Sequence, residues 1–346
     1  MKAHLIFPIL MIMISCGSHE IKTIHPATSR TSEIEEWESL RFGAFVHFND
    51  NTFMGTEFSK NADPSVFNPS NLGIDQMFSG FHDAGVKYAV LTTRHTSGFC
   101  LWDSKTTEFD VASSPVKVDI VKQFVEACRK YDVKPCLYYC LWGGSWKPWE
   151  WNPFIKKELE GTTPKAILLS QLGELASDYG NIYSFWMDMH TWCDTSLSVR
   201  EIYDFLKLKN KWTLVHFNQH VQDGSKIRYF PTDMLNGEER IPPSAGHNPY
   251  RMVDSVLYYL PFEYEITSQQ CDQRSLGNGL MSGSTWFTYS DSRFYPVDSL
   301  YKYILKNFER GGSNILLSTA PDPSGHYRKA DSDSLVKLGK LIWKQN

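Results

Sequence analysis

The chain has 346 residues, a formal net charge of −4 and no basic run, a balance that argues against a nucleic-acid-binding surface. Aromatic residues make up 14% of the chain, a supply that suits either a large core or stacking on the faces of sugar rings. The 7 cysteines include no CxxC pair, and their spacings do not match a zinc site.

The N-terminal 36 residues are predicted to lie outside the fold. Lys2 precedes an apolar run over 5–14, and Ser15-Cys16-Gly17 follows it. This pattern indicates a lipoprotein signal peptide over residues 1–15, with Cys16 lipidated as the first mature residue. An ordinary secretory signal that happens to contain a cysteine is the alternative. Residues 16–36 then form a lipidated end and a polar tether, which predicts lipid anchoring in a bacterial cell envelope, at the periplasm or the outer membrane.

Strand-like and helix-like segments alternate from about residue 37 to the C-terminus. Buried-strand patterns cover 41–48, 86–93, 133–141, 181–190, 212–218, 228–234 and 313–319, and a further strand is expected within 264–289. Helical spacing covers 74–84, 119–131, 164–179, 199–209, 297–309 and 331–343. About eight alternating units predict a parallel sheet closed into a single (β/α)8 TIM-like barrel over residues 37–346. An open doubly wound sheet is the alternative, but the GxGxxG turn typical of that fold is absent.

The segment 181–190, NIYSFWMDMH, is an apolar and aromatic strand pattern that reaches an acid, Asp188. A carboxylate buried without a partner would carry a large desolvation cost. The C-terminal ends of barrel strands open onto the active-site face, so Asp188 is a catalytic candidate. A helix-capping acid, or one paired with an arginine, is the alternative.

Polar residues also stand where the first three strands end. His47, His95 and Tyr139 occupy these positions, and Trp186 lies two residues before Asp188, on the same side of its strand. Such a series at one end of a barrel predicts a shared pocket, although each histidine alone could be structural. Two histidines and an aspartate could also hold a metal. No HxH pair accompanies them, and neither a metal nor a cofactor is expected.

Five segments together resemble glycoside hydrolase family 29, the retaining α-L-fucosidases. They are FGAFVHF, VKYAVLTTRHTSGFCLWDS, VDIVKQFVEACRKYDVKPCLYYC, QLGELASDYGNIYSFWMDM and SNILLSTAPDPSG, in family order between about residues 37 and 343. The resemblance implies a retaining exo-glycosidase that releases terminal α-L-fucose. Many members carry a C-terminal β-sandwich for which this chain has no room, so a Bacteroidetes-type lipoprotein member without that domain is expected.

The resemblance also implies residue roles. Asp188 matches the family's nucleophile, which would form a covalent glycosyl-enzyme. The positions matched to sugar contacts are His47, Glu57, His95, Tyr139, Trp186 and, near the pocket mouth, Trp286.

The acid/base is expected in the segment MLNGEERIPP, at Glu238 or else at Glu239, which is otherwise counted among the substrate contacts. Glu263 and Glu265 are further candidates. A solvated acidic pair beside Arg240 is the alternative interpretation of this loop.

The chain departs from the family pattern around the expected pocket. Thr96 and Ser97 replace a His and an Asp, Met189 replaces a Gly, and Phe48 replaces a Trp. These changes leave two alternatives to strict fucose specificity: the same mechanism with dual or galactose-directed activity on β-D-galactosides, or a non-catalytic sugar-binding barrel. A metal-dependent hydrolase is a separate third possibility. In each sugar-directed case the partner is a fucose- or galactose-containing glycan, with membrane contact through the lipid alone.

Overall fold

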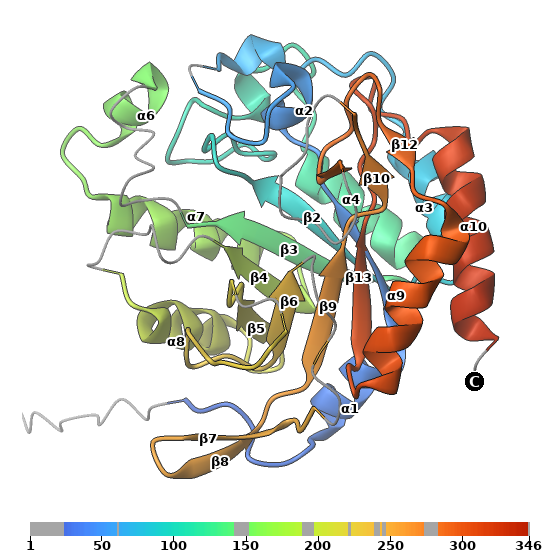
Figure 1. Cartoon of the computed structure of the whole chain (residues 1–346). Coiled ribbons are helices and arrows are strands. Elements are labelled where there is room, and N and C mark those ends of the chain that lie inside the picture. The colour runs from blue at the N-terminus through green and yellow to red at the C-terminus, as the bar shows by residue number, and fades with distance from the viewer. Residues whose placement is uncertain are drawn as a thin grey trace, which may run out of the picture.

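The computed structural model in Figure 1 describes residues 24–60, 62–141, 152–188, 197–220, 223–238, 243, 247–272 and 283–344. The predicted signal peptide and Cys16 lie outside these residues, as do Met189 and Glu239. Within the described ranges, no helix is both long enough and apolar enough to cross a membrane.

Eight parallel strands form a nearly closed barrel, which confirms the predicted fold class. Around the barrel the order is β5-β4-β3-β2-β1-β13-β9-β6. The strands are β1 (Phe42–Val46), β2 (Tyr88–Arg94), β3 (Lys134–Cys140), β4 (Ser184–Asp188), β5 (Leu214–Phe217), β6 (Leu235–Glu238), β9 (Phe262–Ile266) and β13 (Asn314–Ser318). All eight are almost fully buried along their length, as parallel strands covered by helices should be.

The predicted sixth strand was wrong in position. The run 228–234 contains Pro231, which has no N–H to donate to a ladder, and the strand forms only at Leu235–Glu238. The seventh barrel strand, β9, overlaps only the start of the broad range expected for it.

The seam between β5 and β6 is closed by single polar contacts, because the described residues of these two strands share no ladder. The Asp233 carboxylate accepts from the Val215 amide at 2.7 Å, and the Asp233 amide donates to the Val215 carbonyl at 2.9 Å. Further along, the Gln219 amide donates to Oδ1 of Asn236 at 2.9 Å. Single polar contacts therefore join β5 to β6, whereas continuous hydrogen-bond ladders join the other neighbouring strands of the barrel.

Helices surround the barrel on the outside (Figure 1). They are α1 (Ser32–Leu40), α3 (Ile74–Ala84), α4 (Ile120–Lys130), α7 (Pro164–Asp178), α8 (Val199–Lys209), α9 (Val297–Glu309) and α10 (Lys329–Trp343), with the short α2 (Asp50–Met54) and α6 (Pro153–Glu158) and two 3₁₀ turns at Pro64–Val66 and Val111–Ser113. Side-chain oxygens of Asp119, Thr163 and Ser198 cap the first turns of α4, α7 and α8. At Gly339 of α10 a β-carbon would lie 1.9 Å from the Ala84 carbonyl, so only glycine permits this close packing of α10 on α3.

Part of the predicted tether is packed structure. Helix α1 begins at Ser32 and buries Ile34 and Trp37 against the barrel. The tether prediction is therefore wrong for residues 32–36, which sequence alone could not separate from the polar segment before them.

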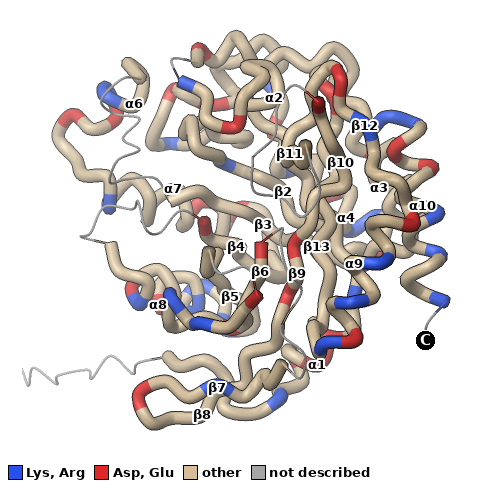
Figure 2. The backbone as a smooth tube through the Cα atoms, viewed as in Figure 1, with Lys and Arg blue, Asp and Glu red and all other residues tan. Residues whose placement is uncertain are grey.

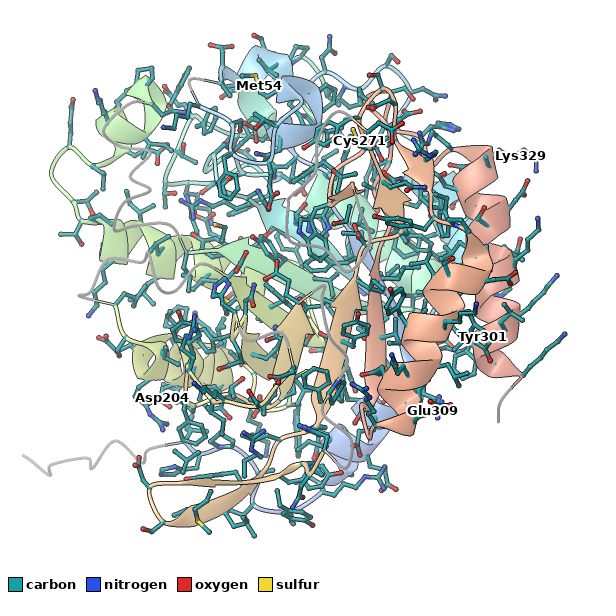
Figure 3. The ribbon with its side chains drawn as sticks, in the orientation of Figure 1. Met54, Asp204, Cys271, Tyr301, Glu309 and Lys329 are labelled. Carbon is teal, nitrogen blue, oxygen red and sulfur yellow. The ribbon has the colours of Figure 1, made fainter. Side chains whose placement is uncertain are left out.

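Small sheets lie at opposite ends of the molecule in Figure 1. The hairpin of β7 (Tyr250–Val253) and β8 (Val256–Tyr259) lies beside α1 at one end. The sheet of β10 (Gln269–Gln270), β11 (Ser284–Thr285) and β12 (Arg293–Phe294) lies at the other end, near α2. Figure 3 places Met54 of α2 and Cys271 at this second end and Glu309 toward the first. The second end is also where the strands reach their carboxyl termini.

Candidate active site

Two carboxylates meet at the carboxyl ends of the barrel strands. Asp188 is the last residue of β4, and Glu238 is the last residue of β6. Asn218, directly after β5, donates from Nδ2 to Oδ1 of Asp188 at 3.0 Å and to Oε2 of Glu238 at 3.1 Å. The two acid side chains are 14% and 33% exposed, so solvent reaches both. The structure thus brings together the two residues predicted to be catalytic.

Tyr138, and not the predicted Tyr139, reaches Asp188. The Tyr138 hydroxyl donates to Oδ2 of Asp188 at 2.7 Å. Burial together with the charge of Asp188 raises the pKa of Tyr138, so the hydroxyl retains its proton. The Tyr139 hydroxyl instead donates to Oε1 of Gln171 on α7 at 2.6 Å. Successive residues of a strand point to opposite faces, so only one of the two tyrosines can face the barrel interior. The structure therefore assigns Tyr139 to the layer between sheet and helices, which corrects its predicted place.

Aromatic rings line the same region as the acids. His47 stacks on Trp286 with ring centroids 5.0 Å apart, His95 stacks on Tyr138 at 5.5 Å, and Tyr138 stacks on Trp186 at 5.4 Å. These contacts join four of the predicted sugar-contacting residues in one wall with Tyr138, the residue that donates to Asp188. The continuous ring surface can accept the C–H face of a pyranose, in the way that aromatic side chains commonly bind sugars.

Both histidines of this wall are held neutral. Burial lowers the pKa of His95 to about 4, against the opposing effects of the Asp188 charge and the Glu57 backbone. Burial, reinforced by His95, also lowers the pKa of His47 well below its ordinary value. A neutral imidazole offers one donor and one acceptor, which suits a hydroxyl group better than a charged partner.

The loop that carries Glu57 is held against the second strand. The Glu57 carbonyl accepts from the Thr96 hydroxyl and from Nδ2 of Asn51, each at 2.7 Å. Thr96 also lies 3.3 Å from Nδ1 of His95. The residue that replaces an expected histidine therefore braces both the loop and His95.

The other two departures in this region also have structural partners. The Ser97 hydroxyl donates to Oδ1 of Asp50 at 2.6 Å, and burial raises the pKa of Asp50 to about 6. The buried ring of Phe48 packs against Phe53 and Phe67, with centroids 5.9 Å and 5.3 Å away. Phe48 thus belongs to the core under this loop.

Glu265 and Glu263 on β9 are more buried than Glu238, and each is only 1% exposed, although Glu265 pairs in register with Glu238. Figure 2 shows acidic positions on both β6 and β9 in a barrel that is otherwise largely uncharged. Trp186 donates from Nε1 to Oε1 of Glu265 at 3.2 Å, and the Tyr88 hydroxyl donates to Oε2 of Glu263 at 2.6 Å. Burial, and then the charges of nearby carboxylates, raise the pKa of Glu265 well above its usual range. Their burial makes both residues weaker acid/base candidates than the partly exposed Glu238.

Sequence reasoning missed Asn218 and His220. Asn218 ends the predicted strand 212–218, so the criterion that selected Asp188, a polar residue at a strand end, could have found it. His220 lies 3.6 Å from Oδ1 of Asp188 through Nε2 and 3.8 Å from Oε2 of Glu238 through Nδ1, and burial lowers its pKa. Its position depends on a left-handed backbone turn, with φ 49°, that no local pattern predicts.

No group of three or more His, Cys, Asp or Glu side chains suited to a metal ion occurs among the residues that the structure describes. The predicted Glu239 and Cys16 lie outside those residues, so their roles stay predictions.

Comparison with known families gives a match over most of the chain. A family model described as Alpha-L-fucosidase matches residues 25–346. Alpha-L-fucosidase 1 of Arabidopsis thaliana is 30% identical over 193 residues, which is 53% of this chain and 36% of that protein. Plasma alpha-L-fucosidase of Homo sapiens is 28% identical over 201 residues, or 44% of this chain and 42% of that protein. The matches thus span less than half the length of these two relatives.

Solved structures share the fold. A putative alpha-L-fucosidase from Bacteroides thetaiotaomicron superposes with a TM-score of 0.70 at 25% identity, over 92% of this chain and 68% of that one. Alpha-L-fucosidase AlfC from Lactobacillus casei, in complex with α-L-fucose product, superposes with a TM-score of 0.66 at 20% identity, over 91% and 99% of the two chains.

Proposed function

The chain belongs to the alpha-L-fucosidase family, and on this premise we propose that it releases terminal α-L-fucose from oligosaccharides or glycoconjugates by a retaining double displacement. Asp188 is the nucleophile in this proposal, and Glu238 is the acid/base. The observation that carries it is the pair of hydrogen bonds from one Asn218 amide group to both carboxylates.

The spacing of the two acids supports retention. Because Asp188 Oδ1 and Glu238 Oε2 each lie within 3.1 Å of the same nitrogen, these oxygens are at most about 6 Å apart. Retaining glycosidases hold their carboxyl groups about 5–5.5 Å apart, whereas inverting enzymes need roughly 6.5–9.5 Å to admit a water between acid and base. The site therefore has room for direct attack by Asp188 on the anomeric carbon.

The reaction then divides into two steps. In the first, Asp188 forms a bond to the anomeric carbon while Glu238 gives its proton to the departing glycosidic oxygen. In the second, Glu238 takes a proton from water, which attacks the same carbon and releases both fucose and the Asp188 carboxylate. Hydrogen bonds from Tyr138 and Asn218 hold the side chain of Asp188, the group that attacks in the first step and leaves in the second.

The ring wall supports binding of a single terminal sugar. His47, His95 and Trp286 are buried beside the acids and present neutral or weakly polar edges. A deoxy sugar such as fucose offers both hydroxyls for the imidazoles and an apolar face for the rings.

The test is hydrolysis of 4-nitrophenyl α-L-fucoside and β-D-galactoside by wild type, Asp188→Ala and the control Asp333→Ala, which changes an exposed residue of α10. We expect fucoside turnover that falls at least about 10³-fold in Asp188→Ala and is unchanged in the control. Proton NMR should show α-L-fucose as the first product. Faster turnover of the galactoside than of the fucoside would change the proposed substrate to a β-D-galactoside and leave the proposed mechanism unchanged. A folded protein that binds fucose without turning over either substrate would refute the enzyme and support a sugar-binding barrel.

We also propose that Cys16 carries a lipid that anchors the protein in the cell envelope. The support is the sequence pattern of residues 1–17. Wild type should incorporate labelled palmitate and sediment with membranes, whereas Cys16→Ala should do neither. Incorporation of label into the variant would show that the lipid is not on Cys16.

A further inference from the structure

We propose that Asn218 is a positioning residue that sets the separation of Asp188 and Glu238 and supplies a hydrogen bond to each. The proposal rests on the function proposed above for these two acids. It goes further by assigning their spacing to one neutral side chain outside both acid-bearing strands.

The Asn218 side chain has the donors that such a role requires. A primary amide carries two N–H donors on one nitrogen, and an ionised carboxylate can only accept. Nδ2 of Asn218 lies 3.0 Å from Oδ1 of Asp188 and 3.1 Å from Oε2 of Glu238, so each acid can receive one of the two hydrogens. An amide has no charge at any working pH, and both bonds therefore persist while Glu238 gains and loses its proton.

The orientation of the amide is determined by a third contact. The oxygen and nitrogen of an asparagine side chain are assigned from their hydrogen-bond partners. Here the backbone N–H of His220 donates to Oδ1 of Asn218 at 2.9 Å. The oxygen must therefore face His220, which turns the nitrogen toward the two acids.

The backbone of residues 218–220 is tied to both strands that carry the acids. The backbone N–H of Asn218 donates to the carbonyl of Met187 on β4 at 2.8 Å, next to Asp188. The Gln219 amide donates to Oδ1 of Asn236 on β6 at 2.9 Å, two residues before Glu238. Movement of either strand end would thus be transmitted to the Asn218 side chain.

This bridge matters because it lies at the seam of the barrel between β5 and β6. In the part of the chain that the structure describes, no strand pairing there fixes how far apart the ends stand. Across this seam the position of Glu238 relative to Asp188 therefore depends on single polar contacts, and Asn218 contacts both acids. Without it, two carboxylates within about 6 Å would repel each other, which disfavours the state in which both are ionised.

The experiment compares Asn218→Ala, the isosteric Asn218→Asp and the control Asn210→Ala with wild type on the aryl fucoside. Asn210 lies before β5 at the opposite end of the barrel, where its side chain accepts from the Trp212 amide. We expect kcat of Asn218→Ala to fall about 10- to 100-fold, the usual effect of losing a hydrogen bond to a charged group. KM should change by less than about threefold, since the bonds that are lost go to the two acids. The control should match wild type.

The pH profile distinguishes positioning from simple packing. The acid limb of kcat/KM reports the essential base of the free enzyme. In Asn218→Ala this limb should move to higher pH, because a carboxylate that loses a hydrogen-bond donor is easier to protonate. Asn218→Asp keeps the shape but adds a third carboxylate, so its loss of kcat should exceed that of Asn218→Ala. If Asn218→Ala does not fold, Asn218→Asp carries the test alone.

The outcomes separate this proposal from the proposed function. Suppose that wild type turns over the fucoside and Asp188→Ala does not. If both Asn218 variants then fold, keep kcat within about twofold of wild type and show an unchanged acid limb, the role of Asn218 alone is overturned. Equal losses in both variants with an unmoved acid limb would assign Asn218 to packing and also overturn it. Failure of wild type to hydrolyse the fucoside, or full activity of Asp188→Ala, would instead refute the proposed function.

Discussion

Replacing Asp233 by asparagine should destabilise the barrel by opening its seam. The carboxylate of Asp233 accepts from Nζ of Lys207 at 2.6 Å, from the Tyr203 hydroxyl at 2.6 Å and from the Val215 amide at 2.7 Å. The Lys207 and Asp233 side chains are only 8% and 6% exposed. In Asp233→Asn the shape is kept, but the buried ammonium of Lys207 loses its counter-charge and keeps two neutral contacts, the Thr213 carbonyl and the Tyr203 ring.

The expected loss follows from that burial. Breaking one side of a buried ion pair typically lowers the free energy of unfolding by about 3–5 kcal/mol, because the remaining charge is left uncompensated. The matched control is Asp333→Asn, which breaks the pair with Lys329 on α10, where the side chains are 57% and 86% exposed. An exposed pair of this kind contributes less than about 1 kcal/mol.

Urea unfolding followed by far-ultraviolet circular dichroism measures both variants against wild type. Adding Lys207→Met to Asp233→Asn should recover part of the loss, since it removes the stranded charge, and the coupling between the two sites should be at least about 1 kcal/mol. A change below about 1 kcal/mol in Asp233→Asn, equal to that of the control, would refute the assignment of Asp233 to the seam.

Two further predictions concern the ring wall. Tyr138→Phe should lower kcat about 10- to 100-fold by removing the hydroxyl that donates to Asp188, whereas Tyr139→Phe, which loses only the bond to Gln171, should retain most activity; equal effects in fucoside assays would contradict the assignment. The pKa of His95 is about 4 in the folded protein, below the ordinary value of 6.5. As the pH falls from 7, the unfolded chain therefore takes up a proton at His95 before the folded protein does, and the free energy of unfolding decreases. Between pH 7 and 5 the free energy of unfolding should decrease by about 2 kcal/mol because of His95, and this decrease should be absent in His95→Asn. Urea unfolding midpoints with the same pH dependence in both proteins would contradict the prediction.

Several features were predictable because they depend on local periodicity. The alternation of buried strands with amphipathic helices predicted the barrel, and the helix 119–131 was expected nearly where α4 forms. Asp188 was found because a carboxylate at the end of a buried strand is costly unless it has a partner or meets solvent at an open site. His47, His95 and Trp186 were found from their positions at or near strand ends, and all three belong to the ring wall around Tyr138, which donates to Asp188.

The missed features depend on which way a side chain points. Tyr138 and Tyr139 are neighbours of the same type, and a shift of one residue moves a side chain to the other face of the sheet. The pairing of Tyr138 with Trp186 across β3 and β4 decides that Tyr138 faces inward. Apart from Lys134 near its start, the segment 133–141 has no charged residue and carries no alternation from which that choice could be made.

The sequence by itself determined the order of most strands and helices, the family resemblance and the acid Asp188 at a strand end, because these follow from patterns within short segments. Only the tertiary structure decided how residues far apart in the chain share contacts. Asn218, Asp188 and Glu238 lie on three different strands or strand ends, and Asp233 closes the seam between β5 and β6. Such contacts depend on barrel closure and register, which join segments that carry no information about one another in sequence.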